Sequence, residues 1–330
     1  MPEPALQIRS TDFRPPLGLT GTHTQSLLAS LKLRNALRAG HPAVVGAHRH
    51  ELTARDGTRL VGWRSAQPGS ARGLIVLIHG WEGCHDSIYL REAACHFFDA
   101  GYNVFRLNLR DHGGTHALNQ APFHSARIDE VIDAVGAAAA LDAELPMSLV
   151  GYSLGGNFAL RVALRGPARG VNPTLTVGVC PAINPRATLR CLDQGPALYH
   201  YYFLKKWRRT LAAKAAAWPG LYDFAELLAP RQFSEITARF AERHTEFGNV
   251  DDYLAAYTLT AEQLKGSGAP IAIITAQDDP VVPYEDFQAL EQDCPFPFLA
   301  PRRGGHCGFI ESWRMRSWAD RAILGLLQQR

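Results

Sequence analysis

A serine within a glycine-rich turn is the first residue whose surroundings suggest chemistry. Ser153 lies in Gly151-Tyr152-Ser153-Leu154-Gly155, which matches the pattern G-x-S-x-G. An apolar run precedes the pattern and an amphipathic run follows it, so the serine is predicted to occupy a sharp strand-to-helix turn. Side chains at positions 151 and 155 would collide with the neighbouring backbone, which explains both glycines. A chance match to so short a pattern is the alternative, and the strand and helix around it argue against chance.

A serine hydroxyl becomes a good nucleophile only with a base to take its proton and a carboxylate to orient that base. Where a serine lies on such a turn, the acid and then the histidine follow it along the chain. Asp278 and Asp279 follow the apolar run at residues 271–276. We expect Asp279 to be the acid, and Asp278 to bond the turn backbone. His306 is the last histidine in the chain, so we expect it to be the base, although a solvated loop histidine is the alternative.

Two backbone N–H groups are expected to stabilise the negative oxygen that a serine attack would create. One belongs to Leu154, directly after the nucleophile. The other is expected from the loop after residues 73–78, where Trp81 follows His79-Gly80. We expect His79 to hold this loop in shape.

Several histidines could suggest a metal site, but glycines interrupt them and no acidic ligand pattern accompanies them. We therefore expect neither a metal nor another cofactor. Cys307 is expected to pack without reacting, since a nucleophile already stands at the serine turn. The histidines concerned are His79, His85, His112, His116 and His124.

The composition indicates one substantial core, because 46% of the 330 residues are hydrophobic. A net charge of +3 is too small to indicate a nucleic-acid partner. Six cysteines without a C-x-x-C pair indicate reduced thiols and a cytoplasmic location. We expect no signal peptide and no transmembrane helix, because the N-terminus has no apolar core region and no uncharged apolar run reaches about 18 residues.

Apolar strand-length runs alternate with amphipathic helical runs over most of the chain. This rhythm predicts an α/β fold with a mostly parallel central sheet covered by helices on both faces. A hairpin is expected over residues 48–63, around Asp56-Gly57. The further strands are expected at residues 73–78, 103–107, 147–152, 175–179, 271–276 and 297–300. Helices are expected near residues 25–37 and at 87–100, 125–141, 155–164, 284–292 and 310–327.

The alternation stops between residues 181 and 268, where helical segments rich in aromatics replace strands. We interpret this stretch as a helical cap over the carboxyl edge of the sheet, where ligands bind in such folds. Residues 1–330 are then one domain with an inserted cap, and residues 1–45 are an extension that packs on it. His112 and Tyr152 are the candidates for bordering the substrate pocket.

Within this cap, residues 198–217 carry aromatics beside Lys205, Lys206, Arg208 and Arg209. Such a helix could lie on an anionic membrane surface. We favour the simpler interpretation, a cap helix with its aromatics over an apolar pocket and a solvated basic face. Peripheral membrane contact is therefore possible but not favoured, and the oligomeric state stays open.

Taken together, these motifs resemble those of the YheT-like branch of the α/β-hydrolases. The resemblance runs nearly end to end. It is carried by Gly21-Thr22-His23-Thr24-Gln25-Ser26, His79-Gly80-Trp81-Glu82-Gly83, His124-Ser125, residues 151–157 (GYSLGGN), Asp252-Tyr253, Asp278-Asp279-Pro280 and residues 304–310 (GGHCGFI). One departure lies at residues 110–116, where relatives have small residues and this chain has Asp111 and His112.

The resemblance implies a hydrolase of short or medium acyl esters, with some eukaryotic relatives acting on phospholipids. It assigns the nucleophile, acid and base to Ser153, Asp279 and His306. A small-molecule ester is the expected partner, and activity should rise with pH around 6–7 as the histidine loses its proton. Two alternatives remain: a non-catalytic ligand-binding protein of the same fold, and an acyltransferase or thioesterase with the same triad.

Overall fold

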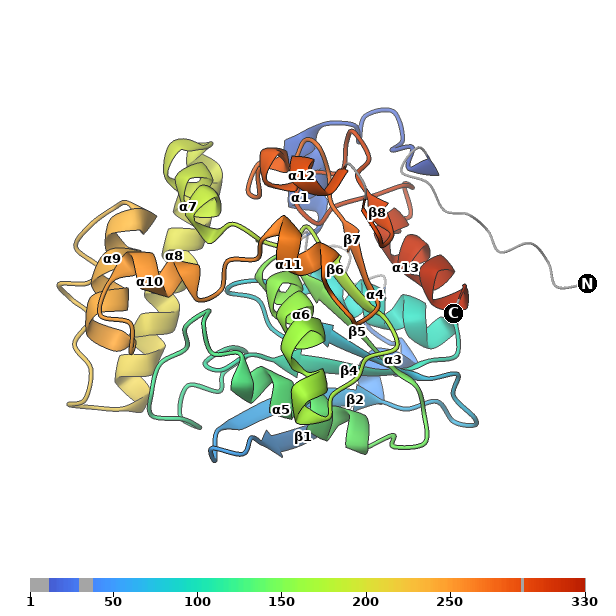
Figure 1. The fold of residues 1–330 in the computed structure, drawn as a ribbon, viewed down its shortest axis with the longest axis horizontal. Helices are drawn as coiled ribbons and strands as arrows, with labels where there is room; N and C mark the ends of the chain where they lie inside the picture. The colour runs from blue at the N-terminus through green and yellow to red at the C-terminus, as the bar shows by residue number, and fades with distance from the viewer. Residues whose placement is uncertain (1–11, 30–37, 292–293, 330) are drawn as a thin grey trace, which may run out of the picture.

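The computed structural model describes residues 12–29, 38–291 and 294–329. Within them lies one eight-stranded sheet in the order β1-β2-β4-β3-β5-β6-β7-β8 (Figure 1). β1 and β2 form the expected antiparallel hairpin, β2 pairs antiparallel with β4, and all other neighbours are parallel. The strands are β1 (His48–Thr53), β2 (Arg59–Ser65), β3 (Leu74–Ile78), β4 (Asn103–Asn108), β5 (Met147–Tyr152), β6 (Thr176–Val179), β7 (Ile271–Ile274) and β8 (Phe298–Leu299).

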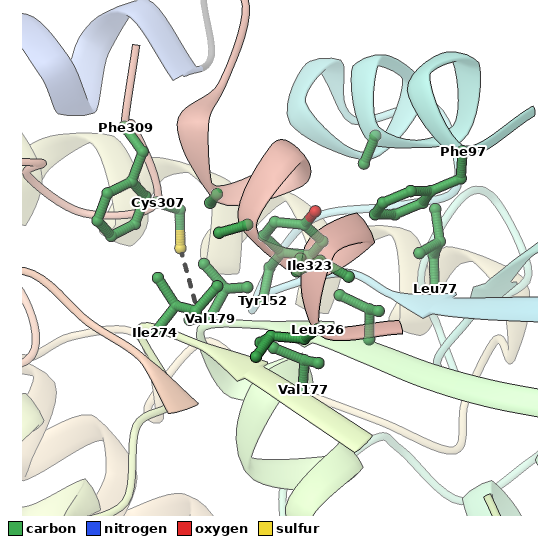
Figure 2. Packing of buried hydrophobic residues seen from close by; sticks show 14 of the residues in the cluster. Leu77, Phe97, Tyr152, Val177, Val179, Ile274, Cys307, Phe309, Ile323 and Leu326 are labelled. Carbon is green, nitrogen blue, oxygen red and sulfur yellow. Dashed lines mark hydrogen bonds between the residues drawn. The ribbon is translucent and has the colours of Figure 1, made fainter. Parts of the chain in front are cut away.

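The central strands are buried on both faces, which explains why they read as continuous apolar runs. On one face, α4 (Ile88–Asp99) and α13 (Trp318–Gln328) pack a core that includes Phe97 and Leu326 (Figure 2). On the other face lie α5 (Asp129–Ala140) and α6 (Leu154–Arg165). The expected α/β architecture is confirmed.

Helices fill the chain between β6 and β7, and no strand occurs in this fully described stretch. Four of them, α7 to α10, gather on one side of the sheet (left in Figure 1). Buried residues of α7, α8 and α9 form one apolar cluster with residues of α6 and β7, whereas Tyr253 and Leu254 of α10 join the cluster around α5 and α6. The helices are α7 (Pro185–Gln194), α8 (Ala197–Ala217), α9 (Phe233–His244), α10 (Val250–Ala255) and α11 (Ala261–Lys265).

The remaining helical elements are short. None of the described helices combines the length and apolarity that a membrane span requires. These elements are α1 (Thr22–Ala29), α3 (Pro42–Val45), η2 (Pro167–Arg169), η3 (Tyr284–Phe287) and α12 (Gln288–Glu291).

Two expected helices differ from the structure. The helix expected from residue 310 begins only at Trp318, because Ile310 pairs with Ser317 in a β-bridge and Met315 turns with a φ of 60°. The helix expected from residue 125 begins at Asp129. In the expected helix near residues 25–37, α1 ends at Ala29 and residues 30–37 lie outside the described residues.

Candidate active site

The serine turn joins β5 to α6 and is strained. Ser153 has a φ of 55° and a ψ of −121°, a conformation that non-glycine residues rarely adopt. A Cβ at Gly151 would lie 2.0 Å from the carbonyl oxygen of Gly155, and a Cβ at Gly155 would lie 2.4 Å from that of Ile78. The backbones therefore approach closely enough that only glycine fits at both positions.

His306 lies between the serine and a carboxylate. Its Nε2 is 2.9 Å from Ser153 Oγ, and its Nδ1 is 2.8 Å from Asp279 Oδ2. The Asp279 side chain is fully buried, and its Oδ1 accepts the N–H groups of Val281 and Val282. Burial alone would lower the pKa of His306, but the Asp279 carboxylate and the neighbouring Cys307 together outweigh burial and raise that pKa well above the usual 6.5.

Asp278 has a different set of partners. Its Oδ1 accepts the Gly305 N–H at 2.9 Å, and its Oδ2 accepts the Thr22 hydroxyl at 2.7 Å. The side chain thus ties the histidine loop to α1. Of these two aspartates, Asp279 is the one whose carboxylate contacts the His306 ring.

Helix α1 supports the histidine from the other side. Ser26 Oγ accepts the His306 N–H at 2.9 Å. The buried Gln25 amide accepts from the Ile310 N–H and donates to the Ile310 carbonyl. The sequence pointed to this segment only through a resemblance and suggested no role for it. Buried polar side chains need hydrogen-bond partners, so a buried glutamine and serine would indicate such support. The sequence alone does not show that these two side chains are buried.

The loop after β3 passes directly beside the nucleophile. A Cβ at Gly80 would lie 3.0 Å from Ser153 Cβ, and Trp81 follows at the cavity wall. Leu154 is the first residue of α6, where N–H groups have no intrahelical acceptor. The buried His79 donates from Nδ1 to the Gly80 carbonyl and accepts the Leu109 N–H at Nε2, so it fixes the loop as expected.

The two pocket candidates from the sequence do not line the cavity beside Ser153. Tyr152 points to the opposite face of the sheet, where its hydroxyl donates to Asp320 (Figure 2). Alternation along a strand sends neighbouring side chains to opposite faces, and both faces of β5 are buried. His112 is buried behind the loop after β3, where its Nε2 accepts the Glu82 N–H at 3.3 Å. Both are corrections to the sequence analysis.

A partly open, mostly apolar cavity of about 100 Å³ lies against Ser153. Residues at the carboxyl edge of the sheet line one side of the cavity, and residues of the cap helices α7 to α9 line the other. The polar side chains in its wall include His124 and Ser125, a pair to which the sequence assigned no place in the pocket. The apolar wall includes Trp81, Leu189, Leu192, Phe203, Trp207 and Phe240.

Two cysteines lie beside the histidine. Sulfur atoms of Cys180 and Cys307 and a ring nitrogen of His306 all lie within 4.8 Å of one another. Both ring nitrogens of this histidine already face Ser153 and Asp279, however. Cys307 points into the core below, where its thiol donates weakly to the Val179 carbonyl (Figure 2). We therefore assign this cluster no metal.

Comparison with known proteins places the chain in a broad family. The chain is 25% identical to "Putative esterase slr0264" of Synechocystis sp. over 90% of this chain and 87% of that protein. The solved esterase Pf2001 of Pyrococcus furiosus superposes with a TM-score of 0.55 at 16% identity, covering 86% of this chain and 91% of that one. A membrane phospholipase A, described as a bacterial virulence factor, gives a TM-score of 0.56 at 16% identity, with 90% and 91% covered.

The similarity to these solved structures shows the fold. The family is shown by a match to a model of a protein family. That model is the alpha/beta hydrolase family, and it matches residues 75–315. The match spans the serine turn, the cap, and the aspartate and histidine loops. The chain belongs to the alpha/beta hydrolase family.

Proposed function

We propose that this protein is a serine-dependent carboxylic-ester hydrolase of the YheT-like branch. The observation that carries the proposal is the continuous chain of contacts from Ser153 Oγ through the His306 ring to the buried Asp279 carboxylate. This geometry is that of a nucleophile, its general base and an orienting acid. One sequence relative is named a putative esterase, and a solved structure of the same fold is an esterase. Both similarities support the same reaction class.

In the first half-reaction, His306 Nε2 takes the Ser153 proton while Oγ forms a bond to the ester carbonyl carbon. The carbonyl electron pair moves to oxygen, and the N–H groups of Trp81 and Leu154 stabilise the oxyanion. When the tetrahedral intermediate collapses, the carbon–oxygen bond to the alcohol breaks. His306 returns its proton to the departing alcohol, which leaves an acyl group on Ser153.

In the second half-reaction, water takes the place of the alcohol. His306 removes a proton from that water as its oxygen attacks the acyl carbon. Collapse of the second intermediate releases the carboxylic acid and returns the proton to Ser153.

The substrate is proposed to be a small ester with a short to medium apolar acyl chain. The cavity of about 100 Å³ is smaller than the pockets of about 300–1,000 Å³ that hold drug-sized ligands, and aromatic and aliphatic side chains dominate its wall. We further propose a cytoplasmic location, which the six free cysteines support.

A fluorophosphonate probe tests the nucleophile directly, because it reacts with an activated serine and displaces fluoride. We expect one probe per chain, located on Ser153 by peptide mass spectrometry. Ser153→Ala should take up none. A folded wild-type protein that stays unlabelled, or that is labelled at another residue, would overturn the proposal.

A further inference from the structure

Three residues of cap helix α8 form a polar row that contacts two loops at the edge of the central sheet. Lys206, Thr210 and Lys214 are spaced four residues apart, so they share one face of the helix. Lys206 Nζ donates to the Glu82 carbonyl at 3.0 Å, and the Thr210 hydroxyl donates to the Glu82 carboxylate at 2.5 Å. One turn further on, Lys214 Nζ is buried and donates to Asp111 at 2.9 Å. This face of α8 is therefore docked onto the loops after β3 and β4.

Glu82 occupies a demanding position in the loop after β3. The Gly83 N–H donates to the Gly80 carbonyl, which closes a four-residue turn, and Glu82 is its third residue with a φ of 56°. Glycine or asparagine is the ordinary choice at a turn position with positive φ. Here a glutamate takes this position, and hydrogen bonds hold both its main chain and its side chain. Its N–H donates to His112, its carbonyl accepts from Lys206 and its carboxylate accepts from Thr210.

The geometry of this turn determines where the Trp81 N–H points. The Gly80 carbonyl and the Trp81 N–H belong to one planar peptide group and point in opposite directions. The Gly80 carbonyl accepts from the Gly83 N–H at 3.0 Å and faces the His79 ring at 2.8 Å. The Trp81 N–H therefore points away from these groups, and its direction depends on the turn staying closed.

The cap also packs against the Trp81 side chain. The ring stacks on Phe203 of α8 with centroids 5.7 Å apart, and it meets Trp207 edge-on at 5.3 Å. Helix α8 thus contacts both the oxyanion-donor residue and the residue that follows it. Burial raises the pKa of Glu82 to about 7, and the contacts from Thr210 and Lys206 oppose that rise.

We propose that Glu82 is a positioning residue through which Thr210 and Lys206 of the cap hold the Trp81 N–H in the oxyanion site. The cap then completes the catalytic machinery as well as shaping the acyl cavity. This inference rests on the proposed ester hydrolysis and extends it. Glu82 itself touches no substrate and acts through the turn it stabilises.

The test compares Thr210→Val, which keeps the shape but loses the hydroxyl, with Thr210→Ser, which keeps the hydroxyl. Lys205→Met is the matched control on the exposed side of α8. A small displacement of a transition-state donor costs about tenfold to a hundredfold in rate. We expect Thr210→Val to lower kcat by about tenfold with KM nearly unchanged, and we expect Thr210→Ser and Lys205→Met to match wild type. In a Glu82→Ala background, Thr210→Val should add little further loss.

A pair of inhibitors separates positioning from general loosening of the cap. A trifluoromethyl ketone forms an oxyanion on Ser153, whereas the matching methyl ketone binds without forming that adduct to a comparable extent. Thr210→Val should weaken only the trifluoromethyl ketone, by the same factor as kcat. Equal weakening of both ketones, a loss confined to KM, or full activity would overturn the inference. Wild-type turnover in the same assay reports on the proposed function, whereas the ratio of the two ketone affinities in each variant reports on this inference alone.

Discussion

Asp278 and Asp279 are adjacent in the chain, yet their carboxylates contact different parts of one histidine loop. Asp279 Oδ2 lies 2.8 Å from His306 Nδ1, whereas Asp278 Oδ1 accepts the Gly305 N–H one residue earlier. The Asp279 side chain is also fully buried and accepts two backbone N–H groups from its own turn. One carboxylate is therefore placed to orient the base, and the other to hold the loop that carries it.

This division of contacts predicts unequal effects of substituting the two aspartates. Asp279→Asn should lower kcat by about 10⁴-fold, because an amide favours the wrong tautomer of the histidine. Asp278→Ala should keep most of the activity and lower the free energy of unfolding by about 1–3 kcal/mol, through loss of the bonds to Gly305 and Thr22. Steady-state kinetics and urea unfolding of both variants check this, and comparable losses of kcat would contradict the assignment.

The pH dependence of kcat/KM should follow the protonation of His306. A protonated ring cannot accept the Ser153 proton, so activity is lost at low pH and gained as pH rises through the histidine pKa. Because the Asp279 carboxylate and Cys307 together raise that pKa well above 6.5, the rising limb should lie higher than the range of pH 6–7 expected from sequence. Profiles from about pH 5 to 9 test this, with Asp279→Asn expected to move the limb to lower pH. A profile that is flat through this range would rule out the histidine as the base.

The buried ion pair between Lys214 and Asp111 should matter for stability. Lys214→Met removes the partner of a buried carboxylate and should cost about 3 kcal/mol of unfolding free energy. The double variant with Asp111→Asn should recover part of that loss, since no buried charge is then left unpaired. Lys205→Met, on the exposed face of the same helix, should leave stability within about 0.5 kcal/mol of wild type. A Lys214→Met protein as stable as wild type in urea would show that the pair contributes little.

The cavity wall should set the acyl-chain preference. Leu192 is buried and lines the cavity, so Leu192→Ala should lengthen the space and move the optimum to a longer acyl chain. Leu198→Ala, in the neighbouring helix and half exposed, is the matched control and should leave the optimum in place. Comparing kcat/KM across an ester series gives the answer. An unchanged optimum in Leu192→Ala would mean that the acyl group binds elsewhere.

Local patterns predicted the elements that carry the site well. The strand expected at residues 147–152 is β5, and His306 lies within hydrogen-bond distance of both Ser153 and Asp279. These signals are local, because glycine at a tight turn and apolar runs of strand length express constraints that act within a few residues.

Contacts between distant segments were not predictable in the same way. Tyr152 was expected at the pocket, but β5 is buried on both faces and its pattern does not show which face meets the substrate. On α8 the expected solvated basic face includes Lys205, Arg208 and Arg209, which are exposed. The sequence did not show that Lys214 is buried, because its partner Asp111 lies more than a hundred residues earlier. The support of His306 by Ser26 depends likewise on a segment 280 residues away.

Hydrolysis of p-nitrophenyl esters from acetate to laurate, with wild type and Ser153→Ala in parallel, tests the central claim most directly. The account predicts turnover by wild type with an optimum at short or medium chains, and a loss of about 10⁶-fold in kcat for a correctly folded Ser153→Ala protein. Undiminished hydrolysis by Ser153→Ala, or no hydrolysis of any ester in the series by folded wild type, would contradict it.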